Sequence, residues 1–201
     1  MTYRPVTDVG LFAHPKVKYY GAFLNGSLER MRLPLGAQIQ DPVLFVCGGK
    51  VREYPCAGFG PNDKTVDINP RLNPDYVMDV RHRLPKKRGG WRAMIVDSPW
   101  SKEQARNYGT EEQYPRPGPL LKLCLEHTRP GGRVGILHWL MPSPPKEVHG
   151  CRIKLVFALP MALYNKTWRG YVVFEKVVPR DGKQGPRFPG MRPGERGRTP
   201  T

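Results

Sequence analysis

The chain has 201 residues, a length that suits one domain with a sizeable core, and its 33 Lys and Arg against 17 Asp and Glu give a formal net charge of +16. This excess favours a polyanionic partner, most simply nucleic acid, because basic side chains that contact phosphates release condensed counterions. No apolar run approaches the roughly 18 residues of a membrane span, and the start MTYRPVTDVG lacks the pattern of a secretory signal, so we expect a cytoplasmic protein with no membrane partner.

Residues 1–42 show no strong hydrophobic period. We expect an N-terminal cap or extension here, in which Tyr19-Tyr20 and Leu28–Leu35 form a cap or a short helix. The α/β domain predicted from the following residues begins after this segment, at residue 43.

Short apolar runs bounded by turn-forming residues recur from residue 43 onwards. They are Val43–Val46, Thr65–Ile68, Tyr76–Val80, Ala93–Val96 and Arg133–His138. Runs that are short and continuous, rather than alternating, are typical of strands covered on both faces, as in a parallel sheet. Between the first two runs, Lys50–Lys64 is interrupted by two prolines and two glycines, so it cannot hold a long helix.

The remaining elements close the sheet. Pro119–His127 carries several leucines and is followed by Arg129-Pro130-Gly131-Gly132, which predicts a helix that stops at this turn and packs on the sheet. Ile153–Leu159 and Gly170–Val177 flank a turn region and predict a terminal antiparallel pair. Residues 43–178 are therefore predicted to form an α/β domain with a Rossmann-like, doubly wound sheet, mostly parallel with a C-terminal antiparallel hairpin.

The C-terminal residues 179–201 consist largely of Pro, Gly and Arg. Such a segment has almost nothing to bury, so we expect a disordered basic tail that either attracts phosphates or only keeps the protein soluble. The four cysteines contain no CxxC pair and no Cys/His spacing typical of zinc, so we expect reduced thiols and no metal site.

Several polar groups follow the predicted strands, at the edge where doubly wound sheets bind ligands. They are Cys47-Gly48-Gly49, Asp67-Ile68, Asp79, Asp97 to Trp100, and His138. Glycines let backbone N–H groups approach a ligand closely, while Asp67 could accept hydrogen bonds from ribose hydroxyls and Asp79 from an adenine amino group. Any one of these acids could instead be a helix N-cap. A dinucleotide-dependent oxidoreductase would need GxGxxG opening a helix, which CGGKVREYPC does not provide.

Four of these segments together resemble a known family. Residues 41–177 are similar to class I S-adenosylmethionine-dependent methyltransferases, and specifically to those that modify exocyclic nitrogens of DNA bases, in VLFVCGG, VDINP, DSPW (residues 97–100) and LEHTRPGGRVGILH. Ser98 stands where that family usually has a proline, and the glycine loop lacks the acid that usually precedes it.

The resemblance implies S-adenosylmethionine as cofactor, bound by Cys47, Gly48, Gly49, Asp67, Ile68 and Asp79. It also implies transfer of a methyl group to a base amine, adenine N6 in DNA before other targets. In this interpretation the Asp97 carboxylate and the Ser98 carbonyl accept hydrogen bonds from the amine, Pro99 shapes the turn, and Trp100 stacks on a flipped base. Alternatively, Asp97 could cap a helix and Trp100 could be a core aromatic.

The segment Ser101–Gly118 interleaves aromatic and basic residues and is predicted to hold the substrate. We expect Arg106, Tyr108, Tyr114 and Arg116 to contact it, with His138 from the next strand end; a solvated loop fits the same pattern. Target recognition would fall to residues 1–42 and 101–118 or to a protein partner. A noncatalytic nucleic-acid-binding relative and an RNA methyltransferase remain as alternatives, and DNA is the preferred partner over RNA.

Overall fold

The computed structural model describes residues 6–7, 10–11, 23, 26–54, 56–162 and 168–178. Tyr19-Tyr20 and the predicted tail, 179–201, lie outside the described residues. The helices are α1 (Ser27–Leu35), α2 (Lys102–Asn107) and α3 (Pro117–His127). The strands are β1 (Val6–Thr7), β2 (Gly10–Leu11), β3 (Val43–Val46), β4 (Lys64–Asp67), β5 (Tyr76–Val77), β6 (Trp91–Val96), β7 (Thr128–His138), β8 (Glu147–Val148), β9 (Cys151–Ala162) and β10 (Trp168–Val177).

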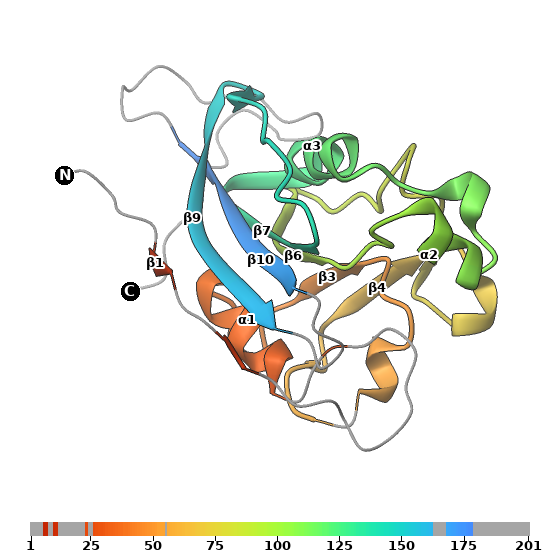
Figure 1. Ribbon diagram of the computed structural model, residues 1–201. Coiled ribbons are helices and arrows are strands. Elements are labelled where there is room, and N and C mark those ends of the chain that lie inside the picture. The colour runs from red at the N-terminus through yellow and green to blue at the C-terminus, as the bar shows by residue number, and fades with distance from the viewer. Residues whose placement is uncertain are drawn as a thin grey trace.

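One mixed sheet organises the described residues, with the strand order β1-β9-β10-β7-β6-β3-β4-β5 (Figure 1). Strands β5, β4, β3, β6 and β7 run parallel, as predicted. Strand β10 is antiparallel to both β7 and β9, which confirms the predicted terminal pair. The short strands β1 and β2 add to the outer side of β9 and were not predicted.

Two hydrophobic clusters, one on each face of the sheet, explain the continuous apolar runs. In β3, Val43 and Phe45 belong to the cluster beneath α1, while Leu44 and Val46 belong to the cluster beneath α3. Figure 1 shows α1 and α3 on opposite sides of the sheet. A strand in this position must be apolar at every residue, because successive side chains enter different cores.

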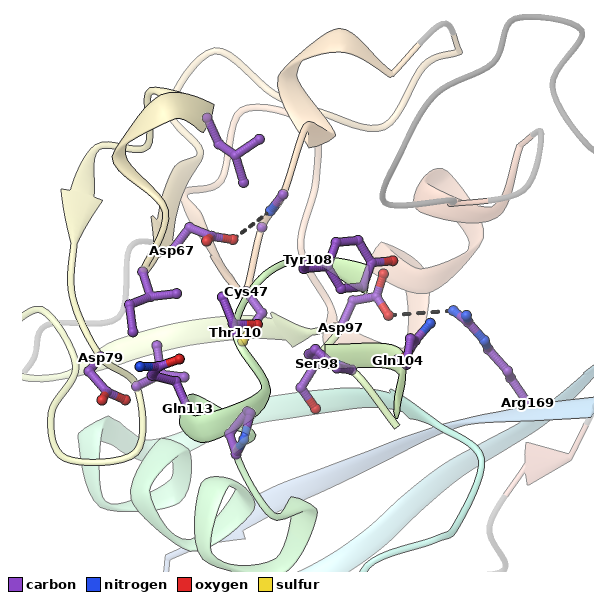
Figure 2. Close-up of a pocket in the computed structure, with 17 residues that line it drawn as sticks. Cys47, Asp67, Asp79, Asp97, Ser98, Gln104, Tyr108, Thr110, Gln113 and Arg169 are labelled. Atoms are coloured by element: carbon purple, nitrogen blue, oxygen red, sulfur yellow. Dashed lines mark hydrogen bonds and ion pairs between the residues drawn. The ribbon is translucent and has the colours of Figure 1, made fainter. Parts of the chain in front are cut away.

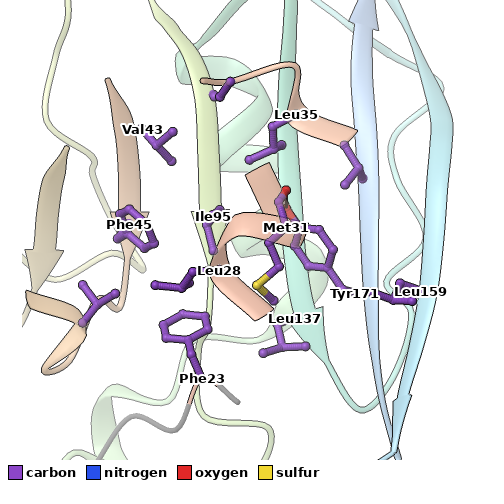
Figure 3. Close-up of a cluster of buried hydrophobic side chains, with 14 of the residues drawn as sticks. Phe23, Leu28, Met31, Leu35, Val43, Phe45, Ile95, Leu137, Leu159 and Tyr171 are labelled. Atoms are coloured by element: carbon purple, nitrogen blue, oxygen red, sulfur yellow. Dashed lines mark hydrogen bonds between the residues drawn. The ribbon is translucent and has the colours of Figure 1, made fainter. Parts of the chain in front are cut away.

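Helix α1 forms part of the hydrophobic cluster that contains Val43 and Phe45 (Figure 3). Its buried residues Leu28, Met31 and Leu35 follow a helical period and face the sheet. The helix ends at Leu35 and is capped by Gly36, whose φ of 63° suits a residue without a side chain. This segment, assigned from sequence to the N-terminal extension, therefore shares the core of the α/β domain.

The connections of the first half of the sheet are short. Among the described residues, the 3-10 turn η1 (Val51–Glu53) is the helical element between β3 and β4, and η2 (Pro70–Leu72) is that between β4 and β5. The described part of 50–64 thus holds no long helix, as expected. The edge of the sheet above these strands is thus lined by loops.

The predicted end of the helix at His127 is confirmed, but Arg129–Gly132 is not a turn, because it lies inside β7, which begins at Thr128 directly after α3. Two contacts make so abrupt a transition possible. The buried Lys176 donates from Nζ to the carbonyl oxygens of Leu125 (3.1 Å) and Thr128 (2.9 Å), at the carboxyl end of the helix. Gly131, with φ of 75°, then accommodates the irregular start of the strand.

Candidate active site

A pocket lies at the carboxyl ends of β3, β4 and β6, the edge where doubly wound sheets bind ligands (Figure 2). Its lining comes from the loops that follow these strands, from the segment 104–115 and from β10. The lining residues are Cys47, Gly48, Gly49, Asp67, Ile68, Leu72, Asp79, Val80, Asp97, Ser98, Pro99, Gln104, Tyr108, Thr110, Gln113, Pro115 and Arg169. All six residues predicted to bind a cofactor, and three of the four DSPW residues, are therefore brought together.

The glycine loop after β3 turns sharply and is tied to the end of β4. Cys47 has φ of 56°, a left-handed conformation that is uncommon for a residue with a side chain. A Cβ on Gly48 would lie 3.2 Å from the Thr65 side chain, so the glycine lets the loop pass close to β4. Asp67 closes the turn, because its carboxylate accepts the N–H of Gly49 at 3.0 Å.

The carboxylate of Asp67 keeps acceptor capacity for a ligand. Its Oδ2 accepts from Gly49 and its Oδ1 from the N–H of Asn69, each at 3.0 Å. A carboxylate oxygen can accept about two hydrogen bonds. One position on each oxygen is thus left for donors such as a pair of hydroxyl groups.

Asp79 is more fully occupied. The side chain of Arg81 donates to both of its carboxylate oxygens, with Nη2 at 2.6 Å from Oδ2, and the N–H of Arg81 donates to Oδ1. This side-chain hydrogen bonding lowers the pKa of Asp79 below its ordinary value. The same arginine donates from Nη1 to the carbonyl oxygen of Glu112 at 2.7 Å, so it joins the β5 loop to the segment above the pocket. Acceptance of an adenine amino group by Asp79 would require Arg81 to move.

Asp97 is the buried acid of the pocket. It follows β6, and its backbone N–H donates to the carbonyl oxygen of Val46 at 3.1 Å, which continues the ladder beyond the strands. Burial raises the pKa of its carboxyl to about 6, although the neighbouring Arg169 acts in the opposite direction. The helix-cap alternative does not hold, because Ser101 caps α2 and accepts from the N–H of Gln104 at 3.1 Å.

Arg169 of β10 faces Asp97 and was missed by the sequence reasoning. Its Nη1 lies 3.6 Å from Oδ1 of Asp97, and its Cζ lies 4.2 Å from the centre of the Trp100 ring. Both side chains of the ion pair are largely buried, at 12% exposure for Arg169 and 14% for Asp97. Its position in the sequence, at the edge of a predicted turn, carries no signal of this contact.

Trp100 is not among the residues that line the pocket. One side of the indole contacts the guanidinium of Arg169, and the half-exposed Trp139 lies 6.4 Å away, centre to centre, at an angle of 57°. The main chain of Trp100 is held by Gln104, whose Oε1 accepts its N–H at 2.7 Å, and by the hydroxyl of Tyr114, which donates to its carbonyl at 3.0 Å. Trp100 is only partly buried, so the core-aromatic alternative does not describe it.

The predicted substrate segment folds over the pocket as α2 and the 3-10 turn η3 (Glu111–Gln113). Of its four predicted contact residues, Tyr108 lines the pocket. Arg106 instead pairs with Glu111 at 2.7 Å, Tyr114 supports Trp100, and Arg116 precedes α3. Gln104, Thr110 and Gln113 line the pocket and were not singled out from the sequence.

His138 and Ser98 are buried at the ends of neighbouring strands. His138 lies outside the pocket lining, and its Nδ1 accepts from the N–H of Leu140 at 3.0 Å. Burial lowers the pKa of His138, which favours the neutral ring. Among the described residues, neither His138 Nε2 nor Ser98 Oγ has a hydrogen-bond partner.

In the described part of the chain, no group of three or more His, Cys, Asp or Glu side chains gathers to hold a metal ion. None of the helices in residues 26–54, 56–162 and 168–178 is long and apolar enough to cross a membrane. All four cysteines are free thiols.

No protein-family model and no curated protein matches the chain. Among solved structures, TrmN from Thermus thermophilus is similar, with a TM-score of 0.51 at 16% identity over 75% of this chain and 48% of TrmN. The chain thus spans about half the length of that protein. An rRNA methylase from Streptococcus thermophilus aligns with a TM-score of 0.42 at 11% identity, over 74% of this chain and 95% of the methylase. A SAM-dependent methyltransferase from Aquifex aeolicus aligns with a TM-score of 0.41 at 14% identity, over 73% and 88%.

These likenesses concern the fold. The similarity to TrmN extends to the Rossmann-like α/β sheet, with its five parallel strands and the antiparallel pair β9 and β10. Fold does not choose a reaction or a substrate, so the activity has to be argued from the pocket.

Proposed function

We propose that this protein transfers a methyl group from S-adenosylmethionine to an exocyclic amino group of a nucleic-acid base. The observation that carries the proposal is the buried Asp97 carboxylate, which lies in one pocket with the glycine loop and Asp67. The order of these groups along the strands is that of the amino-methyltransferases which the sequence resembles.

Asp97 suits an amine target for a chemical reason. The lone pair of an exocyclic amine is spread into the base ring, which makes the nitrogen a poor nucleophile. Hydrogen bonds from the amine to the Asp97 carboxylate and the Ser98 carbonyl would favour a pyramidal, more nucleophilic nitrogen. With its pKa raised to about 6 by burial, Asp97 is still mainly ionised at neutral pH and can accept such a bond.

The chain offers a fitting place for the cofactor. The loop Cys47–Gly49 brings backbone close to the pocket, and Asp67 has acceptor positions left for the ribose hydroxyls. When bound, S-adenosylmethionine would supply an electrophilic methyl group. What the protein adds is positioning, which by itself accounts for much of the acceleration in reactions of this kind.

The net charge of +16 supports a nucleic-acid substrate. We put adenine N6 in DNA first and RNA second, in a cytoplasmic protein. Recognition of the target sequence would come from the segment 101–118 and from residues 1–42, or from a protein partner.

Incubation of the purified protein with labelled S-adenosylmethionine and matched DNA and RNA tests the proposal. We expect label in nucleic acid, recovered as N6-methyladenine after digestion, with Asp97→Asn as the inactive control. If only the DNA or only the RNA carries label, that nucleic acid is the substrate. Cofactor binding without transfer to any nucleic acid would contradict the proposal.

A noncatalytic nucleic-acid-binding relative is the second candidate, because Arg81 occupies the acceptor positions of Asp79. Such a protein would bind nucleic acid without the cofactor. Calorimetry with S-adenosylhomocysteine separates the two candidates, since only the enzyme should bind it.

A further inference from the structure

The guanidinium of Arg169 occupies a distinctive place in the pocket. It contacts Asp97 through Nη1, at 3.6 Å, and lies over the Trp100 ring at 4.2 Å. Arg169 lines the pocket whereas Trp100 does not, as expected when the guanidinium covers the indole on the pocket side. Figure 2 shows the side chain reaching from β10 towards the Asp97 carboxylate.

These two contacts are the same as those proposed for the target base. A guanidinium is planar, carries N–H donors at its edge and stacks on aromatic faces, so it resembles a base with an exocyclic amine. We propose, on the basis of the proposed function, that Arg169 fills the base site of the free protein and leaves it only when an anion of the ligand takes over its guanidinium.

The ion pair is loose enough to exchange. At 3.6 Å its nitrogen and oxygen are farther apart than in a hydrogen bond, and Nε of Arg169 has no hydrogen-bond partner among the described residues. The guanidinium is therefore held by charge and stacking, and a ligand that offers short bidentate hydrogen bonds would hold it more strongly.

Of the other acids in the pocket lining, Asp79 already has a cationic partner, and the open acceptor positions of Asp67 are those proposed for the ribose hydroxyls. Asp67 accepts from Gly49 and Asn69, and Asp79 is bound by Arg81. A buried cation without a partner is costly. The new partner must therefore come with the ligand, as the phosphate of the target nucleotide or the carboxylate of the cofactor.

The position of Arg169 would make the protein select ligands that carry a phosphate. A nucleoside without a phosphate would have to displace Arg169 without compensation, whereas a nucleotide would provide the replacement partner. Arg169 would thus make the protein prefer bases within a strand over free nucleosides.

Fluorescence titration with 2-aminopurine deoxyriboside and its 5′-monophosphate tests this in wild type, Arg169→Ala and Arg169→Gln. The glutamine variant keeps most of the volume, should the alanine variant fail to fold. Arg152→Ala is the matched control, because Arg152 is exposed and pairs with Val177 at the opposite end of the sheet. Repeating the titrations with saturating S-adenosylhomocysteine distinguishes the two anions.

We expect wild type and Arg152→Ala to prefer the monophosphate by about tenfold, the worth of one charge-assisted interaction. Both Arg169 variants should bind the nucleoside more tightly and lose that preference. If S-adenosylhomocysteine alone raises nucleoside affinity in wild type, the cofactor carboxylate is the receiving anion.

Equal weakening of both ligands in the Arg169 variants would overturn the inference, even if methyl transfer is found. The expected switch without methyl transfer would overturn only the enzymatic proposal, and no base binding by any variant would overturn both.

Discussion

The ring of Tyr171 lies against Gly135 of the neighbouring strand, where a Cβ atom would come within 2.0 Å of the phenolic oxygen. Since Gly135 has no side chain, the buried tyrosine can cross beneath α1 and donate to the carbonyl of Met31 at 3.0 Å. Gly135→Ala should therefore lower the free energy of unfolding by about 1–3 kcal/mol or more, as overpacking does. Urea denaturation measures this.

Gly118→Ala is the control for that substitution. A Cβ at Gly118, in the first turn of α3, would meet no atom within 4 Å. Alanine there should be neutral or slightly stabilising, because it is the better helix former. Equal losses of stability for both variants would argue against the contact with Tyr171 as the cause.

The buried pair of Arg32 and Asp63 should be essential for stability. Arg32 Nη1 lies 2.7 Å from Asp63 Oδ2, and Asp63 also accepts the N–H groups of Val43 and Gly60. Asp63→Ala leaves a buried guanidinium without its anion and should cost about 3–5 kcal/mol of unfolding free energy. Arg92→Ala, which breaks the more exposed pair with Asp41, should cost less than about 1 kcal/mol. Similar denaturation midpoints for the two variants would contradict this.

Replacing Asp97 with asparagine should abolish methyl transfer and leave cofactor affinity unchanged. The amide removes the negative acceptor for the target amine but preserves the size of the side chain. Transfer assays together with calorimetry on S-adenosylhomocysteine check both parts. A variant that transfers methyl groups at the wild-type rate would remove Asp97 from the reaction.

Replacing Asp67 should weaken cofactor binding, which is the property that Asp97→Asn is expected to leave unchanged. Asp67→Ala removes acceptors proposed for the ribose hydroxyls and should weaken S-adenosylhomocysteine binding by on the order of 1.5–3 kcal/mol, the worth of hydrogen bonds to a charged group. Glu53→Ala removes the same charge from an exposed position in η1 and is the control. Unchanged calorimetric affinity in a folded Asp67→Ala protein would exclude the residue from the cofactor site.

The rate of methyl transfer should depend on the ionisation of Asp97. Burial raises its pKa to about 6, so the carboxyl is protonated below that pH and cannot act as a charged acceptor. The rate should fall about tenfold per pH unit on the acid side and level off on the alkaline side. In Arg169→Ala the midpoint of the kcat/KM profile, which reports the free protein, should move to higher pH, because the cation that lowers the Asp97 pKa is gone. A profile that stays flat through this region in wild type would contradict the assignment.

Local sequence patterns determined most of the sheet. The run VLFV of β3 is apolar at all four residues because it is buried on both faces, and this composition is visible without a structure. The segment Pro119–His127 carried a helical pattern and lies within α3. The location of the pocket could also be predicted from the sequence, because the carboxyl ends of parallel strands meet at one edge of a sheet.

Tertiary structure decided which of these groups are paired. Asp79 and Arg81 are two residues apart, so this pair could have been suspected from the sequence, yet only the structure shows that it also reaches Glu112. The two-residue strands β1 and β2 are too short to carry a period. The contacts of Arg169 with Asp97 and Trp100 depend on β10 entering the sheet next to β7 in one register, with Gly170 opposite His138. Periodicity reports which side chains are buried, but a contact between distant segments arises only when the packed sheet brings their strands together.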